Sequence, residues 1–261
     1  MDAKINTILI FFCCLLIGSC DKNKEEQSSN TGPATKKTKK KEEKLRPLKD
    51  KNVVEVLTLF GEDHAEDKVI IKTNFGDITI QLYENTPLHK ANFLRLATYK
   101  YFDNTEFYRV IKDFVVQGGD TDELQHKGKK RKFGKYTIPA EFQPKNIHKK
   151  GAIAAARNYE NNPTKRSTPF DFYIVLGTVY NQLQLDALAK ENNVTFSPYQ
   201  TEIYTTIGGT ANLDGEHTVF GEVIEGMEIV IKIAQEEVSP EDNWPIKDVS
   251  IISTEIIQNQ N

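Results

Sequence analysis

The chain is organised around one stretch, Phe107-Tyr108-Arg109-Val110-Ile111-Lys112-Asp113-Phe114-Val115-Val116-Gln117-Gly118-Gly119-Asp120. Its aliphatic and aromatic side chains alternate at the period of a β-strand, and the alternation ends in a polar amide and a pair of glycines. Arg109 is therefore expected on a strand among apolar neighbours. A guanidinium in such surroundings suits a neutral substrate that needs an apolar seat and one fixed hydrogen-bond donor.

Length and composition limit what the chain can be. Its 261 residues, 38% of them hydrophobic, can form one large domain with appendages or two small domains. The net charge of -3 gives no overall attraction to nucleic acid, so we expect no nucleic-acid partner. The three cysteines, Cys13, Cys14 and Cys20, all lie near the N-terminus, so the body of the chain has no disulfide and no thiolate nucleophile. We expect neither a metal nor a cofactor.

The first twenty residues are typical of a targeting segment. Lys4 supplies a positive charge, residues 8–17 are apolar apart from two cysteines, and small residues precede Cys20. The apolar run is shorter than the about 20 residues that span a bilayer. The segment resembles the lipobox of bacterial lipoproteins, which implies a signal peptide at 1–19 and a lipidated Cys20 that anchors the chain to a membrane. The alternatives are an ordinary secretory signal and an uncleaved anchor, and either of them would also export the protein.

The segment that follows the targeting sequence has few large apolar residues. Residues 20–52 are rich in Lys, Glu, Ser and Asn, which predicts a disordered charged tether. As a flexible coil of roughly 30 residues it would reach about 30 Å. Residues 53–66 form an N-terminal extension that begins with an apolar packing segment, and the main domain is expected at 67–257.

The main domain has many strand signals and two principal helices. The strands are expected at 69–73, 78–82, 106–110, 115–118, 151–156, 172–176, 218–223 and 249–252. One helix begins at Pro87, with Thr86 as its N-cap, and the other covers residues 227–235. Because strands and helices do not alternate regularly, a closed or sandwiched antiparallel sheet is favoured.

Residues 177–207 interrupt the strand pattern as a short helical insertion. One helix is expected at 181–192, and Ser197 and Gln200 have capping-box spacing around a proline at the start of the next. The insertion could be a lid that faces a substrate or a decoration of the fold, and decoration is the simpler interpretation.

Four blocks of this sequence resemble the cyclophilin family of peptidyl-prolyl cis/trans isomerases, and they occur in the family's order. The blocks are Asn92-Phe93, the stretch 107–114 with 117–120, Phe172-Tyr173-Ile174-Val175, and Leu213-Asp214-Gly215-Glu216-His217-Thr218-Val219-Phe220-Gly221. The resemblance implies a mostly β fold, namely a closed eight-stranded antiparallel barrel capped by two helices. It also implies that the substrate is a proline-containing polypeptide.

The reaction implied by the resemblance needs neither nucleophile nor metal. An X-Pro bond resists rotation because its nitrogen lone pair is delocalised, which gives a barrier of about 18–20 kcal/mol. A factor of about 10⁵ in rate requires a reduction of only roughly 7 kcal/mol. A catalyst can achieve this by gripping the pyrrolidine ring and donating a hydrogen bond to the nitrogen once its lone pair is localised.

The family's functional positions can be assigned residue by residue. The resemblance implies that Arg109 is the catalytic electrostatic group and that Gln117 positions it. The residues matching the substrate-binding positions are Phe114, Val115, Tyr173 and Leu213 in the proline pocket, His217 at its edge, Ala156 and Arg157 beside the preceding residue, and Asp171 and Asn212 at its margins. Phe172 and Phe220 are expected in the core.

Three features depart from the family's pattern. Asp171 stands where the family has glutamine, and its carboxylate could pair with Arg109 or Arg157 or lie solvated. Asn212 replaces a tryptophan or histidine, which bears on cyclosporin binding more than on catalysis. The run 127–132 is basic where the family is rich in glycine, and a solvated loop is expected there.

Three functions from different classes remain open on the sequence alone. The first is a lipid-anchored isomerase of the bacterial cell envelope, facing the periplasm or the cell surface and assisting the folding of exported proteins as a monomer. The second is a proline-peptide-binding or chaperone module that Asp171 has deprived of turnover. The third is a structural envelope protein in which the insertion at 177–207 makes the contacts.

Overall fold

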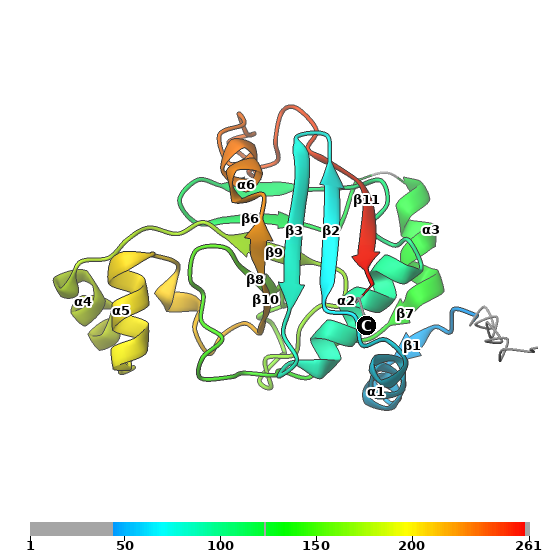
Figure 1. Cartoon of the computed structure of the whole chain (residues 1–261), viewed down its shortest axis with the longest axis horizontal. Helices are drawn as coiled ribbons and strands as arrows, with labels where there is room; N and C mark the ends of the chain where they lie inside the picture. Colours follow the sequence, from blue (N-terminus) through cyan, green and yellow to red (C-terminus); the bar gives the residue numbers. More distant parts are fainter. Residues whose placement is uncertain (1–43, 123, 259–261) are drawn as a thin grey trace, which may run out of the picture. The chain divides into compact units, whose positions relative to one another are not determined.

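The computed structural model describes residues 44–122 and 124–258 (Figure 1). The described residues belong to one compact unit, Lys44–Asn261. The predicted signal peptide, the lipidated Cys20 and most of the tether lie outside the described residues. Within the described ranges, no helix combines the length and apolarity that crossing a bilayer requires.

One antiparallel sheet of nine strands forms the centre of this unit. In spatial order the strands are β4 (Thr105–Glu106), β11 (Ser250–Ile257), β2 (Lys68–Thr73), β3 (Gly76–Leu82), β10 (Val219–Glu225), β8 (Ala152–Ala155), β9 (Phe172–Val175), β6 (Val115–Gly118) and β5 (Arg109–Ile111). Every predicted strand segment has a counterpart among them. The expected hairpin is the β2–β3 pair, in which Thr73 lies opposite Gly76.

The sheet curls through 298° and stays open as a half-barrel, so the predicted closed eight-stranded barrel is not confirmed. Its two edge strands, β4 and β5, are neighbours in the sequence, with only Phe107 and Tyr108 between them. The expected single strand 106–110 is therefore split, because Phe107 donates its backbone N–H to Val249 on the β11 side while Arg109 pairs with β6.

The two predicted principal helices are α2 (Pro87–Thr98) and α6 (Met227–Ile233). Thr86 occupies the N-cap position of α2, but its side chain makes no capping hydrogen bond. Instead, the carboxylate of Glu141 accepts hydrogen bonds from the backbone N–H groups of Leu88 and His89, at 3.0 and 2.9 Å. A carboxylate suits this place because the helix dipole leaves positive charge at the N-terminus.

The structured region begins before residue 53, which corrects the predicted end of the tether. Strand β1 (Leu48–Lys49) pairs in parallel with β7 (Gly134–Lys135), and Leu48 is fully buried. The extension forms helix α1 (Val53–Asp63), which packs against α2 and buries Val53, Leu57 and Phe60. Leu45 also packs against the core, so two apolar residues in a charged segment, together with the backbone ladder, fix the chain here.

The basic run at 127–132 is part of a helix, α3 (Leu124–Phe133), and not the solvated loop that was expected. Two of its lysines contact the body of the protein. Lys129 donates to the backbone carbonyl of Asp103 at 3.0 Å, and Lys130 forms an ion pair with Asp120 at 2.5 Å. The basic side chains of this helix therefore serve partly to dock it.

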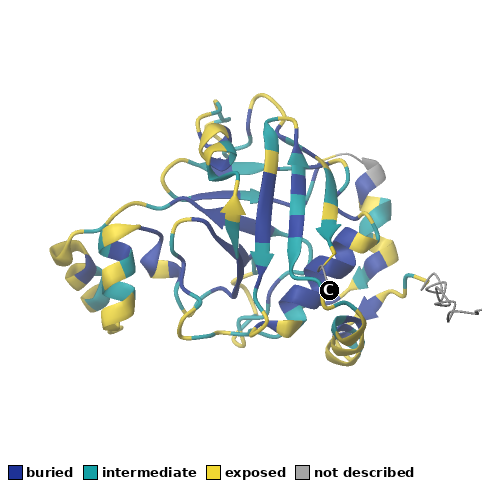
Figure 2. Ribbon diagram, in the orientation of Figure 1, coloured by how far each residue is buried: buried dark blue, intermediate teal, exposed yellow. Residues whose placement is uncertain are grey.

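The insertion consists of helices α4 (Gln182–Asn192) and α5 (Pro198–Thr206), which lie together at one end of the sheet, far from α1 and α3 (Figure 1). The predicted capping box between Ser197 and Gln200 is present. Figure 2 shows that the outer surface of these helices is mostly exposed, whereas α2 and the middle of the sheet are buried. A short 3₁₀ turn (Ala211–Leu213) leads from the insertion into β10.

Alternation along the strands separates two apolar clusters. Val110, Val116, Ile153 and Ile174 face the main core, together with α2 and the predicted core residues Phe172 and Phe220. The residues between them face the other way and form a smaller cluster with Leu213. The site described next lies on this second face.

Candidate active site

The central feature of the site is a row of side chains that crosses four neighbouring strands. Strand register places Arg109 opposite Gln117, Gln117 opposite Tyr173, and Tyr173 opposite Ala154. Directly paired residues in an antiparallel sheet point to the same face. The sheet therefore brings the two predicted catalytic residues beside one wall of the predicted proline pocket.

Arg109 is held by its cross-strand partner. One terminal nitrogen of its guanidinium lies 3.3 Å from the side-chain oxygen of Gln117, so the amide accepts from the arginine. Arg109 is half-buried, and no ion pair involving it occurs among the described residues. A guanidinium fixed by a neutral amide keeps its remaining donors available for a substrate.

Asp171 lies at the end of a relay that starts at Arg109. The nitrogen of the Gln117 amide donates to the hydroxyl of Tyr108, and that hydroxyl donates to Asp171 at 3.2 Å. Neither predicted arginine partner is correct, and a solvated carboxylate is also wrong. Burial raises the pKa of Asp171, while nearby Lys130 partly opposes the rise. Tyr108 is a member of the site that the sequence did not indicate.

Four of the predicted pocket residues form one apolar cluster. Val115, Tyr173 and Leu213 are buried in it, and Phe114 packs against it from a half-buried position. The cluster is completed by small or branched residues of β8, β9 and β10, namely Ala152, Ala154, Val175 and Val219. It is separate from the main core, and the half-buried Phe114 lies at its margin.

His217 lies at the edge of this cluster, as predicted, with its ring centroid 5.6 Å from that of Tyr173. Its Nδ1 lies 3.1 Å from the backbone oxygen of Ala155, and a carbonyl can only accept, so Nδ1 carries the proton. Its Nε2 then accepts from the hydroxyl of Tyr159 at 2.7 Å. Burial lowers the pKa of His217 to about 4, so the ring is neutral at pH 7.

The remaining predicted residues lie around the rim. Ala156 follows β8; its backbone N–H donates to the oxygen of Asp171, and its backbone oxygen accepts from the N–H of Thr168. The guanidinium of Arg157 stacks on Tyr159 at 4.1 Å and pairs with the carboxylate of Glu216 at 2.5 Å. Asn212 is exposed on the 3₁₀ turn beside Leu213.

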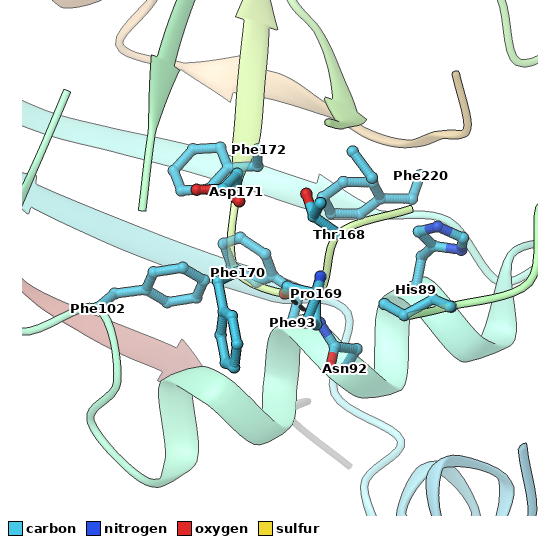
Figure 3. Close-up of a pocket in the computed structure, with 12 residues that line it drawn as sticks. His89, Asn92, Phe93, Phe102, Thr168, Pro169, Phe170, Asp171, Phe172 and Phe220 are labelled. Atoms are coloured by element: carbon cyan, nitrogen blue, oxygen red, sulfur yellow. Dashed lines mark hydrogen bonds between the residues drawn. The ribbon is translucent and has the colours of Figure 1, made fainter. Parts of the chain in front are cut away.

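Close backbone packing supports the rim beside Asp171. Gly119 has a φ of +104°, and a Cβ added there would lie 2.2 Å from the backbone oxygen of Phe170. Figure 3 shows the segment from Thr168 to Phe172 running over α2, where the Asn92 amide donates to the Pro169 oxygen at 2.8 Å. The cavity drawn there is about the size of one water molecule, so it cannot be the substrate pocket.

A buried Ser-His-Glu arrangement also occurs beside α2. The imidazole of His89 bonds to Glu141 at 2.6 Å through Nδ1 and to Ser167 at 2.9 Å through Nε2. Ser167 is only 1% exposed, so no substrate reaches its hydroxyl, and the arrangement holds the start of α2. The described residues contain no group of three or more His, Cys, Asp or Glu side chains that could hold a metal ion.

The comparisons with known proteins point to one family. Residues 68–256 match the family model described as "Cyclophilin type peptidyl-prolyl cis-trans isomerase/CLD". A Staphylococcus aureus protein named "Putative peptidyl-prolyl cis-trans isomerase" is 33% identical over 193 residues, which cover 74% of this chain and 92% of the relative. A Staphylococcus saprophyticus protein of the same name is 33% identical over 194 residues, covering 74% and 93%.

The fold has a solved counterpart as well. The crystal structure of a cyclophilin-type peptidyl-prolyl cis-trans isomerase from Cryptosporidium parvum matches with a TM-score of 0.52 at 22% identity, covering 75% of this chain and 99% of the other. The fold and the family model together define the class of protein. The chain belongs to the cyclophilin-type peptidyl-prolyl cis-trans isomerase family, and its activity is the isomerisation of X-Pro bonds.

Proposed function

We propose that this isomerase acts on proline-containing segments of exported or envelope proteins and that Arg109 is its catalytic group. The single observation that carries the assignment is the half-buried guanidinium of Arg109, which Gln117 holds in the same cross-strand row as Tyr173. No carboxylate in the described part of the chain forms an ion pair with it. It supplies a fixed charge next to an apolar seat, which is the combination that X-Pro rotation requires.

The chemistry follows from this placement. The proline ring sits on Phe114, Val115 and Leu213, and burial there holds one side of the bond still. As the C–N bond twists, it loses its partial double-bond character, and the lone pair of the nitrogen becomes a hydrogen-bond acceptor. Arg109 donates to it, and because Gln117 fixes the guanidinium beforehand, little reorganisation is needed in the transition state.

The substrate rim consists of neutral and already paired groups. Arg157 is engaged by Glu216 and Tyr159, so it acts as a wall for the residue before proline and not as a free charge. His217 is neutral and closes the edge of the seat. A crystal structure of the Cryptosporidium parvum protein was determined in the presence of the dipeptide Ala-Pro, which supports a small residue before the proline.

The position of Asp171 argues against the alternative of a proline-peptide-binding or chaperone module that does not catalyse isomerisation. In that alternative the carboxylate would occupy Arg109 directly, but its partner is the hydroxyl of Tyr108. Tyr108 and Gln117 separate the two charges, so Arg109 keeps free donors for the substrate. A wild-type chain that binds an Ala-Pro peptide but does not accelerate its isomerisation would instead favour the binding module.

We further propose that the sheet closes functionally into a barrel. Only Phe107 and Tyr108 separate its edge strands, and an isolated bridge joins Glu106 to Asp120 across the gap. Slow hydrogen exchange of the Glu106 amide, comparable with that of β6, would support closure. Fast exchange there would show an open edge.

The export assignment rests on the sequence alone. A lipobox-like end at Cys20 and the charged residues after it favour a monomeric domain tethered to a membrane of the cell envelope. In a bacterial host, the wild-type chain should partition with membranes and incorporate labelled fatty acid, and Cys20→Ser should lose both properties. Equal partitioning of the two chains would contradict a lipid anchor at this residue.

The isomerase assignment is tested by nuclear magnetic resonance exchange on an Ala-Pro peptide, with the full chain added at catalytic concentration. We expect the cis/trans exchange rate to rise in proportion to the amount of protein. A second assay follows the refolding of a protein limited by proline isomerisation, which reports on polypeptide substrates. Absence of acceleration in both assays would overturn the proposal.

A further inference from the structure

The helical insertion is joined to the rest of the protein mainly through α5. Its own small cluster consists of Ile147, Leu185, Tyr204 and Ala211. Leu185 is the only buried residue of α4, whereas Tyr204 of α5 is fully buried and reaches inward. The contacts of Tyr204 therefore show what the insertion is attached to.

Those contacts converge on the carboxylate of Asp214, the residue that follows Leu213 of the proline pocket. One oxygen of Asp214 accepts from the backbone N–H of His148 and from its Nδ1, both at 2.9 Å. The other oxygen accepts from the Gln200 amide at 2.9 Å and from the Tyr204 hydroxyl at 2.7 Å. All four acceptor positions of one carboxylate are occupied, which fixes its orientation.

His148 extends this network to the wall of the pocket. Because a carboxylate only accepts, Nδ1 carries a proton. Nε2 forms a hydrogen bond with the hydroxyl of Tyr173 at 3.1 Å. His148 is fully buried and Tyr173 is 4% exposed. A continuous chain of hydrogen bonds thus runs from α5 through Asp214 and His148 to Tyr173.

The stem of the insertion is fixed to the same pocket through the backbone. Thr178 and Gly209 exchange backbone hydrogen bonds at 3.1 and 2.9 Å, so the two ends of the insertion are held together. The N–H groups of Leu176 and Gly177 both donate to the backbone oxygen of Phe114. The N–H of Thr210 donates to the backbone oxygen of His148 at 2.9 Å. The insertion therefore touches Phe114 directly and Tyr173 through His148.

We propose that the insertion at 177–207 is a positioning element of the proline pocket and that the Asp214–His148 pair carries its hold to Tyr173. This inference rests on the proposed function of the pocket. The network ends at the apolar wall and not at Arg109, so it sets how tightly the proline ring is seated. Loss of the network raises the dissociation constant of the substrate more than it lowers the rate of X-Pro rotation in the bound peptide.

The test is Tyr204→Phe, which removes the hydroxyl on Asp214 and keeps the ring in its cluster. The matched control is Tyr199→Phe, the same change at a half-exposed position of the same helix. Exchange spectroscopy on an Ala-Pro peptide gives both its dissociation constant and its exchange rate when bound. We expect Tyr204→Phe to weaken binding about fivefold and to change the bound rate by less than about twofold. The control should change neither.

A double-mutant cycle separates positioning from a general loss of stability. In a Tyr173→Phe background the hydrogen bond to His148 is absent, so adding Tyr204→Phe should weaken binding by less than about twofold. Independent effects that multiply in the double mutant would overturn the proposal. Equal binding by Tyr204→Phe and Tyr199→Phe would also overturn it, whatever their melting temperatures.

The failure of this inference can be told from the failure of the proposed function. A wild-type chain that accelerates exchange, with Tyr204→Phe unchanged, refutes the positioning role and leaves the isomerase assignment intact. The ¹⁵N resonances of the His148 ring give a readout independent of turnover. They should shift in Tyr204→Phe and not in Tyr199→Phe, and identical spectra would refute the connection.

Discussion

Replacing Arg109 with alanine should remove most of the acceleration of X-Pro rotation and leave the fold intact. A preorganised donor aimed at developing charge contributes about 2.7–4 kcal/mol, or about 10²–10³ in rate. Arg109 is half-buried, and water screens part of its field, so we expect the lower end, about a hundredfold. Its hydrogen bond to Gln117, at 3.3 Å, supports the fold by about 1 kcal/mol at most.

The assay measures cis/trans exchange of an Ala-Pro peptide with the wild type, Arg109→Ala, Arg109→Lys and Lys112→Ala. Lysine keeps the charge without the planar fork, so Arg109→Lys should lose about tenfold or more. Lys112 is exposed on the adjacent turn and serves as the matched cation, and its alanine variant should keep the wild-type rate. The assignment of Arg109 is refuted if Arg109→Ala retains more than about a third of the wild-type rate and melts at the same temperature.

Three further predictions follow from the neighbourhood of the site. Burial raises the pKa of Asp171, so the folded chain keeps this proton to a higher pH than the unfolded chain and loses stability as the pH rises through that window. Asp171→Asn should therefore stabilise the protein at neutral pH by about 1 kcal/mol, which raises the melting temperature by about 2–4 °C. The gain should vanish toward pH 3.8, and a lower melting temperature at pH 7 would contradict this. Because the pKa of His217 is about 4, kcat/KM should stay constant from about pH 8 to about pH 6 and decrease below about pH 5. A pH profile of kcat/KM with its midpoint near 6.5 would show that the His217 ring is not desolvated. Gly119→Ala should cost about 2–4 kcal/mol in urea unfolding, because its Cβ would lie 2.2 Å from the Phe170 oxygen. Gly215→Ala, at a φ of +73° with nothing within 4 Å, should cost about 1–2 kcal/mol, and equal losses at the two positions would argue against the close contact.

The strands and the apolar cluster could be predicted because both depend on the alternation of side chains between the two faces of a strand. Val115 and Gln117 lie on one face of β6 while Val116 faces the core, as a period of two requires. The strand that carries Gln117 therefore also carries Val115, which we propose as a pocket residue, on the same face. This local rule, together with the family resemblance, places Arg109, Gln117 and Tyr173 on one face without any knowledge of the loops.

The environment of Asp171 could not be predicted in the same way. Its partner, Tyr108, comes from the gap between β4 and β5, where the chain leaves one ladder and joins another. Where strand pairing changes, alternation no longer tells which way a side chain points. Direct pairing with Arg109 was one of three alternatives for Asp171, and charge alone could not show that Tyr108 would be the partner instead.

The composition of helix α3 favours a helix more than the expected loop. Lys and Arg are good helix formers, and they make up the run 127–132 apart from Gly128, so the run has appreciable helix propensity despite its charge. The sequence did not show which acceptors the lysine side chains of this helix would contact. Asp120 and the backbone of Asp103, both distant in sequence, accept from two of the lysines and make the helix compatible with the surface beneath it.

The place of the insertion in the chain explains why it is connected to the pocket. The chain leaves the pocket after Tyr173 on β9 and returns to it at Leu213, so a segment inserted between them begins and ends at pocket walls. The capping box at Ser197 made the start of α5 predictable, because it depends on neighbours three residues apart. The structure adds a second capping box, between Asn181 and Gln184, at the start of α4. Its attachment to Asp214 depends on Gln200 and Tyr204 meeting a carboxylate that directly follows the 3₁₀ turn. An insertion whose two ends flank a binding pocket is thus placed to tune that pocket, and decoration is the weaker interpretation here.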